Sequence, residues 1–262
     1  NARKLSATEY TFHPQLGYIS LNQKLTNDEV LAVAYQYTIG DQVYQVGEFG
    51  TDGVDATNVD SGGIPSSQAL LLKMLKSNLV VVTEPAWDLM MKNIYQIQGG
   101  YQLQQEDFKF NILYTDPSPL NYITEAGVDP LPADVEETPL LKVFNVDKLN
   151  YTNDPQEGGD GFFDFIPGLT VDTQKGRIIF TTVEPFGKHL FEKLRLNPTE
   201  DYDGTIYNSN QTKYVFRNLY KSTQAAALQE SAKNKFQLKG RFKSMGGDGI
   251  SIGAFNVPQG SV

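Results

Sequence analysis

The chain has 262 residues, no cysteine, two histidines and a formal net charge of −9 at pH 7. The lack of cysteine excludes disulfide scaffolds, cysteine-ligated zinc or iron–sulfur sites, and cysteine proteases. The negative charge disfavours general binding to nucleic acids or anionic membranes, because both are themselves negatively charged. The length allows one large domain or two small ones, each with a real hydrophobic core.

The composition favours strands and turns over a helical bundle. Hydrophobic residues make up 40% and charged residues 20%, as in ordinary globular proteins. The 14 tyrosines and 15 phenylalanines favour strands, and the 23 glycines and 13 prolines favour turns. We therefore predict an α+β fold with mixed, mainly antiparallel sheets, three or four helices and no transmembrane segment. The domain prediction is a single soluble domain over residues 5–257, or two lobes divided within 115–160.

The N-terminus begins Asn1-Ala2-Arg3-Lys4, without an initiator Met and without an apolar run behind the basic pair. We expect a mature chain or an excised piece, with Asn1-Ala2 as a remnant of vector cleavage. The longest unbroken apolar run is Val30–Tyr35. It is far shorter than the roughly 20 residues that a membrane helix needs.

The first predicted elements are strands. Residues 17–21 predict one strand, and the alternation from Leu31 to Ile39 predicts a second. A turn at Gly40-Asp41 then returns the chain through residues 42–49 as a hairpin. Tyrosine-rich strands of this length also occur in membrane barrels. Here only one predicted hairpin has strands of that length, and helices are expected to follow it, so a soluble sheet is favoured.

Two helices are predicted next. One covers residues 66–76, with serines at its start as caps, and the other covers residues 85–97, with a proline at its first position. The second helix carries Trp87, Met90 and Met91. These side chains are typical of a stripe facing the core, which we favour over a binding groove.

The second half is predicted to combine strands with short helices and a proline-rich loop at residues 124–138. Strands are expected at 108–114, 140–146, 169–172, 177–183, 236–242 and 250–255, and helices at 188–195 and 225–234.

The charge is unevenly distributed. Residues 115–164 hold 11 acids and two lysines, a local charge of −9, whereas residues 212–243 hold eight basic residues and one acid, a local charge of +7. We predict that the basic stretch docks on the acidic one, within the domain or across a partner. For the basic stretch, an ordinary solvated face is favoured over nucleic-acid binding.

Two carboxylate pairs are candidates for acid–base chemistry. Asp52 and Asp55 lie in a glycine-rich turn, and Glu136 and Glu137 lie in the proline-rich loop. A glycoside hydrolase needs two carboxylates that face each other at about 5–10 Å. Because these acids lie in predicted loops, solvated surface is the favoured interpretation.

A run of oxygen-bearing side chains is the candidate metal site. Asn153, Asp154, Glu157 and Asp160 bracket glycines and could wrap Ca²⁺. Their spacing lacks the EF-hand pattern, so a plain acidic turn is favoured.

The histidines and glycine-rich segments give no catalytic signature. Neither His13 nor His189 has a second histidine at metal-binding spacing, and a structural role is favoured for both. The sequence has no nucleophile elbow and no Walker loop, and the glycine-rich residues 246–249 are interpreted as a turn. The sequence therefore assigns no catalytic, cofactor-binding or metal-binding residue, and no cofactor.

Several long phrases resemble one family. They are LGYISLNQKLTNDEVLAVAYQYT (16–38), QVGEFGTDG (45–53), WDLMMKNIY (87–95), NILYTDPSP (111–119), DGFFDFIPGLTVDTQKGRIIF (160–180) and VEPFGKHL (183–190). Together they resemble the SprA/Sov family, the giant outer-membrane translocon of the type IX secretion and gliding-motility system of Bacteroidetes. The matching phrases span most of residues 5–195, and the segment beyond about 205 matches less distinctively.

The resemblance implies that this chain is a soluble piece of a very large β-barrel protein that exports folded cargo. It implies a place in the cell envelope at the outer membrane, on the periplasmic or the extracellular side. The implied partners are other parts of the translocon and secretion-system proteins, with no nucleic acid. The family carries no catalytic residues over to this sequence. The phrase VEPFGKHL has a physical interpretation as well: it is a structural joint at which a strand ends and a helix begins.

The leading hypothesis is thus a non-enzymatic domain that contributes to protein export by scaffolding, gating and partner contacts. The alternative is an extracellular carbohydrate- or surface-binding module that uses exposed Tyr and Trp. A glycoside hydrolase is a third hypothesis, which requires two facing carboxylates in a deep cleft.

Overall fold

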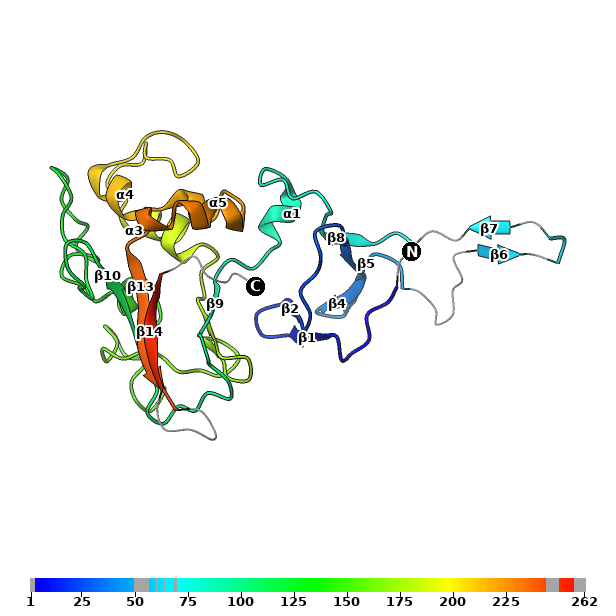
Figure 1. Cartoon of the computed structure of the whole chain (residues 1–262), viewed down its shortest axis with the longest axis horizontal. Coiled ribbons are helices and arrows are strands. Elements are labelled where there is room, and N and C mark those ends of the chain that lie inside the picture. Colours follow the sequence, from blue (N-terminus) through cyan, green and yellow to red (C-terminus); the bar gives the residue numbers. More distant parts are fainter. Residues whose placement is uncertain are drawn as a thin grey trace. The chain divides into compact units, whose positions relative to one another are not determined.

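The computed structural model describes residues 3–49, 57–59, 61–63, 65–67, 70–243 and 250–256. The chain divides into two compact units, which are described separately below (Figure 1). The large unit comprises residues 1–22 and 91–262, and the small unit comprises residues 23–90. The boundary between lobes expected within 115–160 is not where the chain divides, because side chains of that segment belong to the core of the large unit.

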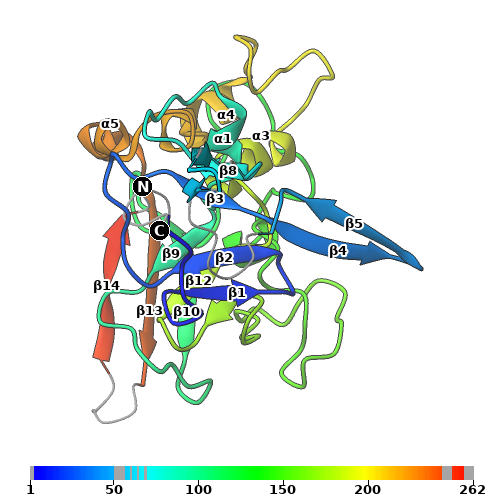
Figure 2. The ribbon, with the colours of Figure 1, turned by 90° about the vertical axis from the view of Figure 1, so that its right-hand side faces the viewer.

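The described strands of the large unit form antiparallel sheets. β1 (Tyr10–His13) pairs with β2 (Tyr18–Leu21). β11 (Val171–Asp172), β12 (Arg177–Ile179) and β9 (Ile94–Gln96) form a sheet in that order. β10 (Lys109–Tyr114), β13 (Phe236–Phe242) and β14 (Ile250–Asn256) form another, in which β13 lies in the middle, as Figure 2 shows.

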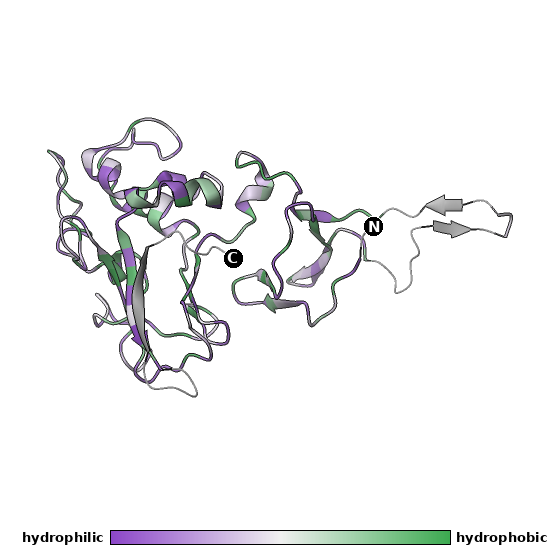
Figure 3. Ribbon diagram, viewed as in Figure 1, coloured by the Kyte–Doolittle hydropathy of each residue, from purple (hydrophilic) through white to green (hydrophobic). Residues whose placement is uncertain are grey.

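The strand β13 has one buried face and one exposed face. Phe236, Leu238 and Phe242 are buried, whereas Lys239 and Arg241 are exposed. Hydrophobic and hydrophilic residues therefore alternate along this strand (Figure 3). Such alternation with a period of two is the pattern that directs one face of a strand to the core and the other to solvent.

The helices of the large unit are all short. They are α2 (Leu140–Val143), α3 (Leu190–Lys193), α4 (Ser209–Tyr214) and α5 (Gln224–Gln229), with a π-helical turn at Pro185–His189 and 3₁₀ turns at Arg217–Leu219 and Ser231–Lys233. α4 begins with a capping box. The Asn208 side chain accepts a hydrogen bond from the Gln211 backbone N–H at 2.8 Å, and the Gln211 side chain accepts one from the Asn208 N–H at 3.0 Å.

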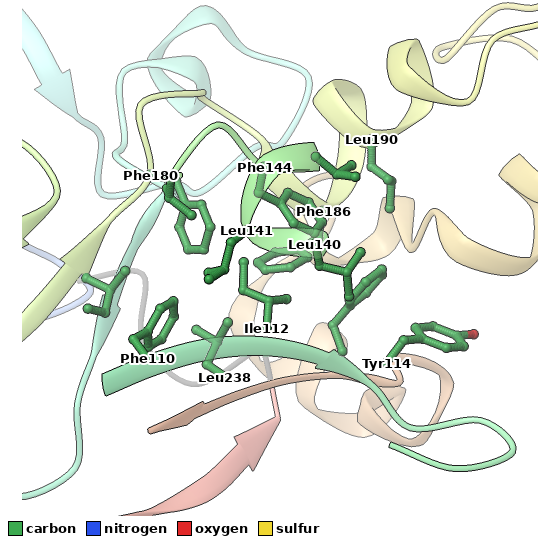
Figure 4. Packing of buried hydrophobic residues seen from close by; sticks show 14 of the residues in the cluster. Phe110, Ile112, Tyr114, Leu140, Leu141, Phe144, Phe180, Phe186, Leu190 and Leu238 are labelled. Carbon is green, nitrogen blue, oxygen red and sulfur yellow. The ribbon is translucent and has the colours of Figure 1, made fainter. Parts of the chain in front are cut away.

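A phenylalanine-rich core joins α2, α3 and α4 to β10 and β13 (Figure 4). The ring of Phe186 lies 4.7 Å from that of Phe144, 5.1 Å from Phe236 and 5.4 Å from Phe180, measured between centroids. All four side chains are fully or almost fully buried. Edge-to-face and tilted ring pairs at these distances stabilise a core beyond the area that they bury.

The π-helical turn contains a position that only glycine can occupy. A Cβ atom on the buried Gly187 would lie 2.5 Å from the Tyr202 hydroxyl and 2.6 Å from a Tyr220 ring carbon. The tyrosine side chains thus pack directly on the backbone of the turn. Burial raises the pKa of Tyr220, whose hydroxyl lies 2.7 Å from that of Tyr95.

The described strands of the small unit form three two-stranded antiparallel sheets. β3 (Leu31–Val33) pairs with β8 (Lys73–Lys76), β4 (Tyr35–Ile39) with β5 (Gln42–Val46), and β6 (Thr57–Val59) with β7 (Pro65–Ser67). α1 (Pro85–Asp88) follows. The predicted turn Gly40-Asp41 closes β4 and β5, and Gly40 has the positive φ of +58° that such turns require.

Three predicted elements are wrong. The helix expected at 66–76 is replaced by parts of β7 and β8, because residues 73–76 pair with the distant strand β3. The helix expected at 85–97 ends after one turn, and Ile94–Gln96 instead pairs with β12. The strand expected at 140–146 begins with the helix α2, since a run of buried apolar residues does not distinguish the two structures.

The predicted α+β class with antiparallel sheets is confirmed, with five short α-helices in the described residues rather than three or four. The strands predicted at 17–21, 108–114, 236–242 and 250–255 and the predicted hairpin at Gly40-Asp41 are present, and the strands predicted at 169–172 and 177–183 appear in shorter form as β11 and β12. Among the residues that the structure describes, no helix combines the length and the apolar composition needed to cross a membrane.

Candidate functional site

A cavity of about 180 Å³ lies against the loop of residues 147–164 in the large unit. Five aromatic side chains line it, those of Phe108, Tyr151, Phe162, Phe163 and Phe165. The remaining lining consists of amide and carboxylate side chains, so polar groups and aromatic rings converge on one small space.

Three of the phenylalanines that line the cavity pack against one another. The Phe108 ring lies 4.9 Å from that of Phe165 and 5.8 Å from that of Phe163, which in turn lies 4.9 Å from Phe110 on β10. In contrast, the side chains of Tyr151 and Phe162 are exposed, with 87% and 65% of their surfaces accessible. The cavity is therefore lined by the buried Phe165, by the half-buried Phe108 and Phe163, and by two aromatic residues that reach into solvent.

Two buried carboxylates hold the loop in shape. Asp147 accepts hydrogen bonds from the backbone N–H groups of Asp160 (2.9 Å) and Gly161 (3.1 Å). Asp164 accepts them from Lys148 (2.8 Å) and Leu149 (3.2 Å). The two acids thus tie opposite ends of the loop to each other. Burial raises the pKa of Asp147, although its two backbone hydrogen bonds act in the opposite direction.

The candidate calcium ligands do not converge. Asp154 accepts a hydrogen bond from the Thr152 hydroxyl, Asp160 accepts one from the Phe162 N–H, and Glu157 is exposed. Asn153 and Asp160 line the cavity. No group of three or more acidic or histidine side chains suited to a metal ion occurs within the described ranges of the chain. The geometry of these residues is that of a hydrogen-bonded acidic turn.

Both histidines have structural contacts. His189 shares a 2.7 Å hydrogen bond with the Val143 carbonyl, so its Nε2 carries the proton. His13 stacks on Tyr18 with 4.2 Å between ring centroids. Burial lowers the pKa of each imidazole and favours its neutral form.

The candidate acid–base pairs are not brought into a cleft. Glu136 and Glu137 are both exposed in the loop before α2. Asp52, Asp55 and the glycine-rich residues 246–249 lie outside the described residues.

Among the described residues, no ion pair joins the two charged stretches, so the electrostatic docking predicted for them is not seen. Lys221 lies 3.7 Å from Glu184 and 3.6 Å from Asp203, and neither of these acids belongs to the 115–164 stretch. The stretches meet instead through neutral contacts, as where the Thr115 hydroxyl donates to the Lys235 carbonyl at 2.9 Å. Within the described part of the chain, Asp134 is the one acid of the 115–164 stretch that forms an ion pair. Its partner is Lys193, which does not belong to the basic stretch.

The small unit presents a second feature, an apolar face on the β4–β5 hairpin. Tyr37 and Tyr44 are cross-strand partners whose rings stack at 5.2 Å, and Tyr35 lies 6.1 Å from Tyr37. Ile39 belongs to the same face by strand alternation, whereas Thr38 belongs to the opposite one. All these residues are exposed, and Ile39 is 64% accessible.

The core of the small unit is minimal. Among its described residues, Trp87 is the single buried hydrophobic side chain, at 9% exposure, and most of the exposed large hydrophobic residues of the chain lie in this unit. Trp87 is buried as the core interpretation predicted, but Met91 belongs to the large unit, where it packs near Ile94 and Ile179. The Trp/Met stripe predicted for one helix is therefore divided between the two units.

The sequence interpretation missed the roles of Tyr151 and Phe162. The signal that could have identified them is the placement of aromatic residues in an otherwise polar, glycine-rich loop, where burial does not require them. No protein-family model matches this chain, and no curated protein matches it at a significant level.

Proposed function

We propose that this chain is a non-enzymatic domain of a type IX secretion translocon, held in the cell envelope at the outer membrane. It contributes to protein export by contacts with other parts of the translocon and with secretion-system proteins. Two observations support the proposal. One is the set of phrases that resemble the SprA/Sov family, and the other is the exposed apolar surface of the small unit.

The apolar face of the β4–β5 hairpin carries the proposal. A two-stranded hairpin is marginally stable in water when it stands alone, and it normally gains stability by packing an apolar face against another element. Exposed apolar patches on soluble domains commonly mark protein interfaces, in which tyrosine is among the enriched residues. In this hairpin every residue of β4 is exposed, although one of its faces consists of Tyr35, Tyr37 and Ile39.

In-cell photocrosslinking tests the proposal. A photoreactive phenylalanine analogue is placed at position 39 of the translocon protein that contains this chain, and in a matched control at position 38. The two positions are adjacent in sequence but face opposite sides of the hairpin. We expect position 39 to crosslink to translocon or secretion-system subunits in much higher yield than position 38. Equal yields at the two positions, or no crosslink to such subunits, would contradict the proposal.

A carbohydrate- or surface-binding module is the second candidate function. The exposed rings of Tyr35, Tyr37 and Tyr44 favour it, because clustered aromatic faces suit stacking on a ligand. The burial of the lone Trp87 does not favour it. A glycan array probed with the wild-type chain and with Tyr37→Ala separates the candidates, since the module requires binding that the substitution abolishes.

A further inference from the structure

We infer that the cavity at residues 147–164 is a binding site for the guanidinium group of an arginine side chain on a partner polypeptide. The inference stands on the geometry and charge of this loop and does not depend on the proposed function.

The size of the cavity points to a single side chain. Pockets for drug-sized ligands occupy about 300–1,000 Å³, whereas an apolar cavity of about 150 Å³ suffices for benzene. The cavity here measures about 180 Å³. It is therefore large enough for one flat guanidinium group with part of its alkyl chain, and too small for an oligosaccharide.

The charge of the lining points to a cation. Asp160 and Asp164 contribute carboxylates, and none of the described residues that line the cavity is basic. One oxygen of Asp160 accepts from the Phe162 N–H at 3.0 Å, and its Oδ2 has no protein partner among the described residues. The surrounding stretch 115–164 carries a charge of −9. One of its carboxylates, that of Asp134, forms an ion pair with Lys193. The cavity thus offers a carboxylate oxygen in a negative field.

The aromatic residues point to arginine among the cations. A guanidinium group is planar, stacks on aromatic faces and forms directional hydrogen bonds to carboxylates, which a lysine ammonium does not match. Tyr151 and Phe162 are exposed beside Asp160, so a guest in the cavity would cover part of their apolar surface. The side-chain amides of Gln105 and Asn153 supply additional acceptors in the lining, whereas the Asn150 amide oxygen already accepts three hydrogen bonds from Thr152 and Asp154.

The loop is preorganised for binding. The buried carboxylates of Asp147 and Asp164 fix its backbone at both ends, and Phe163 and Phe165 anchor it to Phe108. A site that is already formed loses less conformational entropy when a ligand binds. Recognition of one side chain in this way is typical of a weak contact that adds specificity to a larger interface.

A titration followed by NMR tests the inference on the intact chain. The probe is the peptide acetyl-Gly-Arg-Gly-amide, and the control probe is acetyl-Gly-citrulline-Gly-amide, which has nearly the same shape without the charge. We expect millimolar binding of the arginine peptide, with shifts confined to residues 105–108 and 147–165, and at least about fivefold weaker binding of the citrulline peptide. High salt should weaken the binding, because the attraction is electrostatic.

Matched variants locate the site. Asp160→Asn keeps the acceptor for the Phe162 N–H but removes the charge, and it should weaken arginine binding at least about threefold. Phe162→Ala should weaken it to a similar extent. Glu157→Gln removes an exposed charge from the same loop outside the cavity lining and should change the affinity less than twofold. The inference is overturned if neither peptide binds, if the two peptides bind equally, if Glu157→Gln acts as strongly as Asp160→Asn, or if a neutral sugar such as maltose shifts these resonances and the arginine peptide does not.

Discussion

The close approach of Gly159 to Asp147 leads to a sharp prediction about the loop. Gly159 has φ = +64°, and a Cβ atom there would overlap the Asp147 carboxylate, with its Cγ 2.5 Å away and the Asp147 carbonyl oxygen 2.7 Å away. In Gly159→Ala, the left-handed conformation costs about 1–2 kcal/mol, and displacement of the carboxylate weakens hydrogen bonds worth about 1.5–3 kcal/mol each. We expect the variant to lose about 3–5 kcal/mol of the free energy of unfolding of the large unit.

Gly158→Ala is the matched control. Gly158 has a similar positive φ of +81°, but a Cβ atom there meets nothing within 4 Å. This variant should lose only the conformational cost of about 1–2 kcal/mol. The difference between the two variants isolates the steric effect of the Asp147 contact.

Two spectroscopic signals separate the units in a urea titration. The lone tryptophan, Trp87, lies in the small unit, so its fluorescence reports on residues 23–90, whereas far-ultraviolet circular dichroism reports mostly on the larger unit. We expect Gly159→Ala to shift the circular dichroism transition and to leave the fluorescence transition in place. Equal shifts for Gly158→Ala and Gly159→Ala would refute the reasoning, because the Asp147 contact would then contribute nothing.

Two further predictions concern the core and the pH dependence of stability. Phe186→Ala should lower the free energy of unfolding by about 3–5 kcal/mol, because it leaves a cavity at a fully buried site. Phe162→Ala should change it by less than about 0.5 kcal/mol, because the Phe162 side chain is 65% exposed. Urea titrations of both variants compare these two values directly. Burial lowers the pKa of His189 in the folded state below its ordinary value of 6.5, so the unfolded chain takes up the proton first and stability falls as the pH drops through 6.5. His189→Gln should therefore flatten the stability profile between pH 7 and pH 5, and a profile as steep as that of the wild type would contradict this assignment.

Local sequence signals predicted the parts of the fold that depend on neighbours in the chain. Gly40-Asp41 defines the hairpin because a two-residue turn with a positive φ selects that geometry. The alternation along Phe236–Phe242 defines a strand with one buried face. Both signals act over a few residues, so they are readable from the sequence.

Elements that depend on distant partners were not predicted correctly. The apolar residues in and just before residues 73–76 are spaced as in a helix. Residues 73–76 nevertheless form a strand, because they pair with β3, which lies far earlier in the sequence. The short helix α2 is buried almost completely, so its sequence shows neither a helical nor a strand period. In both cases tertiary packing overrides a weak local preference.

The candidate site shows the same limit. The acidic, glycine-rich character of the loop was predicted, and its carboxylates do lie in a turn. The cavity itself was not predictable, because Phe108 joins Phe163 and Phe165 across more than fifty residues of sequence. The roles of Asp147 and Asp164 depend equally on the folded path of the loop, which alone brings the backbone N–H groups to their oxygens.

Secretion by cells with substitutions on the β4–β5 hairpin tests the central claim most directly. Ile39→Glu places a charge on the apolar face, and Thr38→Glu places the same charge on the opposite face one residue away. Each is introduced into the translocon protein that contains this chain, at equal protein levels, and the export of a type IX cargo is measured in the culture medium. The account predicts that Ile39→Glu reduces export severalfold and that Thr38→Glu leaves it near the wild-type level. The account would be contradicted if each of the two single variants exported the cargo at the wild-type level.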